Sequence, residues 1–371
     1  MKNISGILVL GSNPHAKAVQ EILIEHHERV YVSDCTELFM QPQKFLSFLL
    51  HRNINMIIPT RLNHLEFFDS DFFSLRGIKI FSPLGESLHI EKNRSFAMDL
   101  CKAHDIPHPF WASFSSSIQA KEFLSKKNKN FVIKNLYCPS NSSLQAKVCK
   151  NSDELIQYLD TQDQNDDFFL QEYCGTFELG HVAMVDHGNI QSLVSNQEYK
   201  WSQDGNLGLM QSQPFGALAI QDPKDQFGLA KNLLLPLRPW FEKVSYIGPI
   251  QVTAIWNEGT WKVLEYNARL GVSVMKLLFC MLQDPVEWIR KACFEQILSQ
   301  AQWKEHYLYG LSTSLYDNNI HSNSDRTFAN QKIVLRKNDS TQLWWDQVEK
   351  ISAQQYKSLG PRICEAAAFG P

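Results

Sequence analysis

Residues 250–270 read IQVTAIWNEGTWKVLEYNARL, two strand-like runs joined by a short turn that contains a glycine. This pattern is typical of an antiparallel hairpin. Because alternate side chains of a strand share one face, Glu265, Asn267 and Arg269 are expected to point the same way. Carboxylate and amide oxygens suit Mg²⁺, and a neighbouring guanidinium can bind the phosphates that accompany it. The stretch therefore favours a magnesium–nucleotide site, and a solvated polar face at the edge of a sheet is the alternative.

The composition indicates a globular protein with no strong charge preference. The chain has 371 residues, 44% of them apolar, with 36 basic and 39 acidic side chains and a net charge of −3. This length and apolar content predict two or three domains with large cores. The near-neutral balance argues against nucleic acid or an anionic membrane as a partner. Any anionic ligand must then be bound by local charge.

The cysteines and the apolar segments favour a soluble cytoplasmic protein. Eight cysteines occur singly at irregular spacings, without a C-x-x-C motif, so we expect reduced thiols. The apolar run at 7–10 is too short for a secretory leader, and no apolar stretch reaches the ~20 residues that a membrane span needs. The sequence alone does not choose between a monomer and a homodimer.

The first part of the chain predicts a doubly wound parallel α/β domain, at residues 1–88. Strand-like runs alternate with helix-like periodicity, and the expected strands lie at 4–10, 29–32, 55–59 and 78–81. Gly11 begins the first turn, where a helix N-terminus could hold a phosphate. A dehydrogenase of the Rossmann type is disfavoured because Gly11 stands alone where that motif has three glycines.

The remaining chain predicts an α+β domain at 89–305, with a small lid subdomain at about 107–174, and a β-rich domain at 306–371. A single amphipathic helix is expected over 225–244, directly before the hairpin. The strand-like end of the chain predicts a shortened last domain.

The order of motifs resembles the ATP-grasp ligases, and among them the phosphoribosylamine–glycine ligase family. The similar segments are RGIKIFSPLGESLHIEKNRSFAMDLCKAHDIPHP at 76–109, FVIKN at 131–135, LQEYCGTFELGHVAMVDHG at 170–188, SNQEYKWSQDGNLG at 195–208 and KVLEYNARLG at 262–271. The resemblance implies an ATP-grasp fold and ATP-dependent joining of a carboxylate to an amine. It also implies ATP and Mg²⁺ as cofactors, with Mn²⁺ as a substitute.

Several residues take nucleotide-binding roles through this resemblance. Arg94 matches a position that binds nucleotide phosphates, and Lys134 ends the strand FVIK where a lysine reaches the phosphates. The hinge that reads adenine through its backbone corresponds to Glu172, Tyr173 and Cys174.

Further roles follow from the same resemblance. Glu178 matches the carboxylate that accepts hydrogen bonds from the ribose, and Glu265 and Asn267 match the metal ligands. Arg269 and Lys200 match positions near the reacting phosphate and the acceptor, which makes them candidate catalytic residues. A solvated or structural charge is the alternative for Arg94, Glu178 and Lys200.

The sequence departs from the family where the other substrates should bind. The lid loop NLYCPSNSSLQAKV at 135–148 has no glycine, although Ser140, Ser142 and Ser143 could offer hydroxyl groups in its place. The acids of the family's Gly-Asp-Pro-Glu signature are missing at 271–274, which read GVSV. We therefore expect a ligase with altered substrates, and a nucleotide-binding relative that no longer ligates is the second hypothesis.

Overall fold

The computed structural model describes residues 5–371 except 28, 64, 128, 139–145, 150, 163–166, 204–206, 211–213, 295–299, 317–331 and 335–341. The chain forms two compact units. The first unit combines residues 1–82, 193–222 and 270–371, and the second combines 83–192 and 223–269. The three domains expected from the sequence stay a prediction, because the two units divide the chain differently. Among the described residues, no helix is long and apolar enough to cross a membrane.

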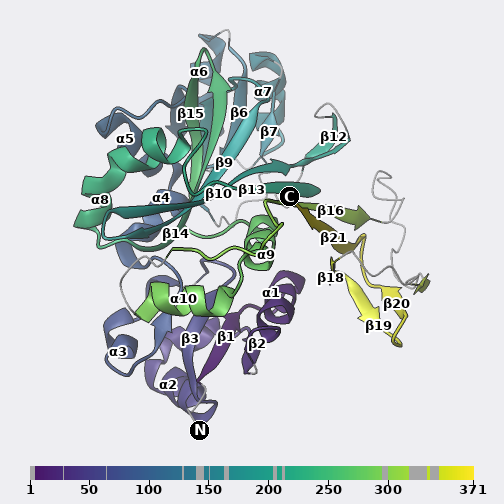
Figure 1. Cartoon of the computed structure of the whole chain (residues 1–371). Coiled ribbons are helices and arrows are strands. Elements are labelled where there is room, and N and C mark those ends of the chain that lie inside the picture. Colours follow the sequence, from purple (N-terminus) through teal and green to yellow (C-terminus); the bar gives the residue numbers. More distant parts are fainter. Residues whose placement is uncertain are drawn as a thin grey trace. The chain divides into compact units, whose positions relative to one another are not determined.

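A four-stranded parallel sheet opens the first unit, as the sequence predicted. Its order is β2-β1-β3-β4. The strands are β1 (Gly6–Leu10), β2 (Val30–Ser33), β3 (Ile54–Pro59) and β4 (Lys79–Ile80) (Figure 1). The connecting segments form α1 (Pro14–Ile24), η1 (Thr36–Met40), α2 (Pro42–His51), η2 (Leu65–Phe67) and α3 (Ser70–Ser74). β1 is buried along its whole length, which explains its apolar sequence GILVL.

The turn after β1 needs its glycine. Gly11 has φ +146°, and a Cβ there would lie 2.5 Å from Oγ1 of Thr60. Thr60 is held in place because its hydroxyl donates to the carbonyl of Leu10 at 3.0 Å. Asn13 then caps α1, with its side-chain oxygen accepting from the amide of Ala16 at 2.8 Å. Packing and capping thus account for this turn without a ligand.

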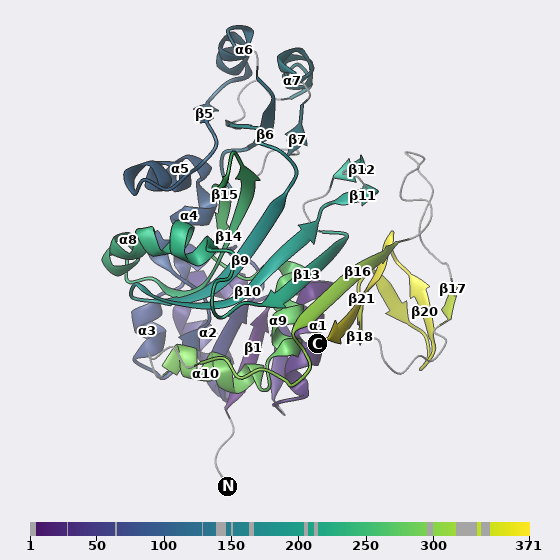
Figure 2. The same ribbon diagram turned by 45° about the horizontal axis from the view of Figure 1, so that its top comes forward.

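The rest of the first unit is mainly antiparallel. The boundary between the two units falls within β10 (Asn189–Tyr199). This strand pairs with β13 (Gly216–Gln221). The sheet then continues in the order β16 (Tyr309–Tyr316), β21 (Arg362–Gly370) and β18 (Gln342–Trp345) (Figure 2). Smaller pairings join β11 (Trp201–Gln203) to β12 (Leu207–Met210), and β17 (Lys332–Val334) and β19 (Val348–Lys350) to β20 (Gln355–Ser358). The helices are α9 (Val272–Met281) and α10 (Pro285–Phe294).

The predicted hairpin is confirmed in the second unit. β14 (Ile247–Asn257) pairs antiparallel with β15 (Thr260–Asn267), and β9 (Glu178–Asp186) pairs with the other edge of β14. Glu258 and Gly259 form the two-residue turn with φ of 51° and 79°. The register shifts opposite Thr253–Ala254, so Leu264 is an extra residue in β15. This bulge changes the alternation of buried side chains just before Glu265.

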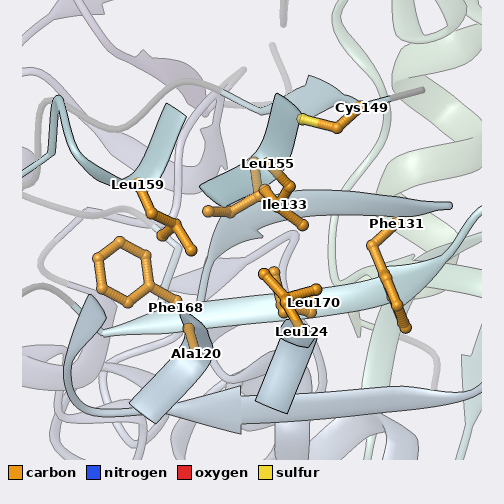
Figure 3. Packing of buried hydrophobic residues seen from close by; sticks show 9 residues of the cluster. All are labelled: Ala120, Leu124, Phe131, Ile133, Cys149, Leu155, Leu159, Phe168 and Leu170. Atoms are coloured by element: carbon orange, nitrogen blue, oxygen red, sulfur yellow. The ribbon is translucent and has the colours of Figure 1, made fainter. Parts of the chain in front are cut away.

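A second antiparallel sheet forms the small subdomain. Its order is β5-β8-β6-β7, from β5 (Trp111–Phe114), β6 (Phe131–Asn135), β7 (Lys147–Val148) and β8 (Phe168–Glu172). α6 (Ser117–Ser125) and α7 (Ser152–Leu159) cover one face. Figure 3 shows the core between the sheet and these two helices. It is made of Ala120, Leu124, Phe131, Ile133, Cys149, Leu155, Leu159, Phe168 and Leu170. The core lets this sheet hold residues of β6 and β8 in fixed register.

The helical segments of the second unit correct one expectation. The segment before the lid forms η3 (Gly85–Leu88), α4 (His89–Lys92) and α5 (Arg94–Ala103). The single helix predicted over 225–244 is wrong. The structure has instead a π-helical turn, η4 (Ala230–Leu234), then η5 (Leu235–Leu237) and α8 (Arg238–Lys243). Pro236 and Pro239 explain the breaks, because proline lacks the amide that a continuous helix needs.

Candidate active site

The side-chain oxygens of Glu265 and Asn267 lie together at the end of β15, and the guanidinium groups of Arg94 and Arg269 lie beside them. We call this pair of residues the oxygen edge. Glu265 and Asn267 are two residues apart on the strand, and both side chains are half-buried. Nη2 of Arg94 lies 3.8 Å from Oε2 of Glu265. Nη2 of Arg269 donates to Oδ1 of Asn267 at 3.5 Å. The structure therefore brings together both predicted metal ligands and two of the predicted phosphate-binding cations.

Arg94 reaches this edge from the start of α5. Asn93 caps the helix, with its side chain accepting from the amide of Phe96 at 3.1 Å. Nη1 of Arg94 donates to the carbonyl of Asn135 at 2.9 Å, which connects α5 to the end of the lid strand β6. Nε of Arg94 is buried and makes no hydrogen bond to the described residues. A buried donor on a cation fits an anionic ligand such as a phosphate.

Glu91, which the sequence did not single out, holds the segment that follows β15. Glu91 is buried, with 7% of the residue exposed. Its Oε2 accepts from the amide of Ala268 at 2.6 Å, and its Oε1 accepts from Nε of Arg269 at 3.0 Å. Burial raises the pKa of Glu91, and the charge of Arg269 opposes that rise. Glu91 is separated from Arg269 by most of the domain in sequence, so no local spacing could have indicated the contact.

Lys134 is connected to β15 through a second residue that the sequence did not single out. Nζ of Lys134 donates to Oε1 of Gln171 at 3.0 Å. Nε2 of Gln171 donates in turn to the carbonyl of Leu264 at 3.2 Å, and Gln171 is 1% exposed. A polar residue directly after the apolar run FFL at 168–170 was the available signal. Lys134 is thus held toward the strand that carries Glu265.

The predicted hinge follows β8 directly and is braced on both sides. The amides of Glu172 and Tyr173 donate to the carbonyls of Phe110 and Asn130 at 2.8 and 2.9 Å. The carbonyl of Cys174 accepts from Nδ2 of Asn257, in the hairpin, at 3.0 Å.

Charges of both signs lie around the hinge. Oε1 of Glu172 pairs with Nζ of Lys129 at 2.7 Å. Burial, and then the charge of Glu178, raise the pKa of Tyr173. The segment predicted to read adenine and ribose is therefore ordered, and its contact with a nucleotide stays a prediction.

A small recess lies between α4, α5 and the end of β15. Its volume is about 20 Å³, and its walls include Glu91, Arg94, Cys138, Glu265 and Asn267. This volume has room for a cation or a water molecule next to the two proposed metal ligands. Two oxygen donors of this kind fit Mg²⁺, which completes its shell with water and phosphate oxygens.

Other predicted residues lie in the first unit or outside the described residues. Lys200 lies in the first unit, between β10 and β11, and its role stays a prediction. Ser140, Ser142 and Ser143 lie outside the described residues. The GVSV segment at 271–274 leads into α9, whose first turn has no acid.

The antiparallel strands, the lid subdomain and the cation-bordered oxygen edge together define an ATP-grasp protein. Comparison with known families agrees: residues 92–273 match the family described as phosphoribosylglycinamide synthetase, ATP-grasp (A) domain. Residues 92–273 therefore form an ATP-grasp domain, and the chain is a distant relative of phosphoribosylamine–glycine ligases, as its motifs predicted.

Individual relatives are distant. The phosphoribosylamine–glycine ligase of Halalkalibacterium halodurans is 23% identical over 65% of this chain and 58% of its own length. The enzyme of the same name from Synechocystis is 25% identical over 63% of this chain and 58% of its own. The bifunctional purine biosynthetic protein PUR2,5 of Pichia angusta is 24% identical over 70% of this chain and 34% of its own. The matched region therefore spans less than two thirds of these relatives.

Solved structures share the fold across the chain. The phosphoribosylamine–glycine ligase of Thermotoga maritima superposes with a TM-score of 0.76 at 15% identity, covering 98% of this chain and 92% of that one. The biotin carboxylase of Campylobacter jejuni, solved with an ATP analogue, gives a TM-score of 0.68 at 11% identity, covering 99% and 88%. These likenesses confirm the predicted fold class: a parallel α/β region, an ATP-grasp region and a C-terminal β-rich region.

Proposed function

We propose that the protein is an ATP-dependent ligase that joins a carboxylate to an amine. The observation that carries the proposal is the edge formed by Glu265 and Asn267, with Arg94 at 3.8 Å from the former and Arg269 at 3.5 Å from the latter. Metal-binding oxygens between two cations are what a magnesium-bound polyphosphate requires. The related family supports the same reading.

Each residue takes a role that its contacts support. Glu265 and Asn267 would hold Mg²⁺ or Mn²⁺, which neutralises the phosphates. Arg94 and Lys134 would bind the phosphate oxygens from α5 and β6. Arg269 would stabilise the charge that develops during transfer.

The remaining roles belong to the adenosine end and to the acceptor. The backbone at residues 172–174 would read adenine, through Glu172, Tyr173 and Cys174, and Glu178 would accept from the ribose hydroxyls. Lys200 would serve the acceptor. The three-part division at 1–88, 89–305 and 306–371, with a lid at about 107–174, is our proposal for how the chain organises these tasks.

The reaction needs positioning rather than a protein nucleophile. A carboxylate oxygen of the substrate attacks the γ-phosphorus of ATP, the bond to the bridging oxygen breaks, and an acyl phosphate and ADP form. The amine then attacks the acyl carbon, phosphate leaves, and the amine loses a proton. Phosphoryl transfer of this type depends on alignment and on charge neutralisation, which the cations at the end of β15 supply.

The substrates are a small carboxylate and a small amine. The names of the relatives give glycine and phosphoribosylamine for those enzymes. The missing acids at 271–274 and the glycine-free loop at 135–148 favour a different pair here.

The test is an assay of ADP release over a panel of amino acids and amines, including glycine and phosphoribosylamine. We expect release that needs both a carboxylate and an amine, and that Glu265→Gln together with Asn267→Ala abolishes it. Glu287→Gln is the matched control, because Glu287 is an exposed acid on α10 that pairs only weakly with Lys291 at 3.4 Å. ATP binding without turnover over the whole panel would contradict ligation.

The glycine-free lid loop favours a second candidate, a nucleotide-binding protein that does not ligate. Such a protein would gain about 2.7 kcal/mol of stability at a 100-fold excess of ATP over its dissociation constant. It would form no ADP under any substrate condition. Substrate-dependent ADP release eliminates this candidate.

A further inference from the structure

Arg269 lies beyond the last hydrogen-bonded residue of its strand. β15 ends at Asn267, so strand pairing does not fix the backbone at Ala268 and Arg269. Ala268 is nevertheless completely buried. A buried amide without a partner costs about 1–3 kcal/mol, so this segment needs an acceptor from elsewhere.

The carboxylate of Glu91 provides that acceptor and holds the guanidinium with the same group. One oxygen binds the Ala268 amide at 2.6 Å, and the other binds Nε of Arg269 at 3.0 Å. One buried carboxylate therefore fixes both the backbone of Ala268 and the side chain of Arg269. Because a guanidinium is planar, a fixed Nε also fixes the direction of both Nη atoms.

The direction that results is toward the proposed metal ligands. Nη2 of Arg269 reaches Oδ1 of Asn267 at 3.5 Å, and the side chain of Arg269 keeps 30% of its surface exposed. The side chain of Glu91 is 5% exposed, so the guanidinium offers a ligand much more surface than the carboxylate does. The buried carboxylate of Glu91 thus orients the guanidinium of Arg269, and the guanidinium is the group that contacts the ligand.

We propose that Glu91 is a positioning residue for polyphosphate binding, which acts by aiming Arg269 at the phosphate oxygens beside Glu265 and Asn267. This inference rests on the proposed function. It assigns to Glu91 a role in the affinity for the phosphate end of the nucleotide, beyond its contribution to folding.

The test is a double-mutant cycle read by isothermal titration of the full chain. MgATP and AMP are titrated into the wild type, Glu91→Gln, Arg269→Met and the double variant. Glutamine keeps the volume of Glu91, but only its oxygen can accept, so one of the two donors loses its partner. We expect Glu91→Gln to weaken MgATP about tenfold, which corresponds to about 1.4 kcal/mol. AMP, which lacks the β- and γ-phosphates, should change less than about twofold.

The cycle separates positioning from general stability. If Glu91 acts through Arg269, then Glu91→Gln adds less than about twofold once Arg269 is methionine. Glu365→Gln is the matched control: Glu365 is also a buried acid, 1% exposed and paired with Lys276, but it lies on β21 of the other unit. It should lower the unfolding midpoint and leave MgATP affinity unchanged. Where Glu91→Gln does not fold, Glu91→Asp keeps the charge and gives the same readout.

Each outcome decides the matter. Additive effects in the cycle, or equal losses for MgATP and AMP, overturn the role of Glu91 while the proposed function stands. A wild type that does not bind MgATP overturns both.

Discussion

Replacing Lys276 with methionine tests how the first unit tolerates buried charge. Lys276, on α9, is 3% exposed, and it pairs with Glu365 on β21, which is 1% exposed. Nζ of Lys276 also lies 4.8 Å from the centre of the Trp344 ring. Arg362 is the second cation, with Nη2 at 3.2 Å from Oε2 of Glu365 and Nε at 3.2 Å from Oδ2 of Asp346. Methionine keeps the length of the lysine but leaves Glu365 with one cation.

The magnitude follows from the cost of a buried, poorly compensated carboxylate. Breaking a buried pair on one side costs about 3–5 kcal/mol, and because Arg362 stays in place we expect about 3 kcal/mol. Adding Glu365→Gln removes the carboxylate, so the double variant should return to within about 1 kcal/mol of the wild type. A recovery of this kind separates the charge from the packing of the two side chains.

The pH dependence gives a second check with a defined sign. Burial alone would raise the pKa of Glu365, but the charge and hydrogen bond of Lys276, together with the neighbouring Ser312 and Ser273, hold this pKa below the ordinary 4.5. In the wild type the lowered pKa of Glu365 therefore contributes stability above pH 4.5, and this contribution is lost as the pH falls through the lowered value. Without Lys276 we expect the pKa of Glu365 to rise, because burial is then less opposed. The penalty of Lys276→Met should then be largest near neutral pH and shrink toward pH 4.5.

The assay is urea unfolding of the wild type, the two single variants and the double variant at several pH values. Two results would refute the reasoning: a Lys276→Met penalty below about 1 kcal/mol, or one that grows as the pH falls. A double variant no more stable than Lys276→Met would show that packing, rather than charge, sets the cost.

Two further predictions concern the two folding units separately. Phe168→Ala should lower the free energy of unfolding by about 3–5 kcal/mol, because Phe168 is completely buried in the lid core. Thermal unfolding measures this loss. A loss below about 1 kcal/mol would mean that the core is not packed as described. Gly11→Ala should destabilise the first unit by about 2 kcal/mol or more, because φ is +146° and the new Cβ would meet Thr60. Gly85→Ala is the control, because Gly85 also has a positive φ of 58° but no atom lies within 4 Å of a Cβ built there. We expect a smaller loss of stability for this variant in the same denaturation experiment.

The regular parts of the fold could be predicted from the sequence for physical reasons. The alternation of apolar runs with helical periodicity gave the parallel sheet, and the Glu258-Gly259 turn gave the β14–β15 hairpin. The single helix expected over 225–244 does not form because Pro236 and Pro239 interrupt a segment whose apolar spacing alone is helical. The chain also returns twice to the first unit and once to the second, and apolar periodicity carries no information about such long-range returns.

The candidate site could be predicted where its residues are close together in the sequence. Glu265 and Asn267 are two residues apart on one strand, so spacing alone placed them on one face. Glu91 and Gln171 were missed because their partners, Ala268 and Leu264, are distant in sequence and take part through backbone groups. A sequence shows which side chains are charged, but not which distant amide or carbonyl they satisfy.

The most direct test of the central claim is isothermal titration of MgATP into the full chain, in parallel with the variant that combines Glu265→Gln and Asn267→Ala. We predict that the wild type binds MgATP and that the combined variant binds it at least about tenfold more weakly, because both metal-binding oxygens of the edge are changed. The absence of binding to the wild type, or equal affinity in the combined variant, would contradict the assignment of this edge as the magnesium–nucleotide site.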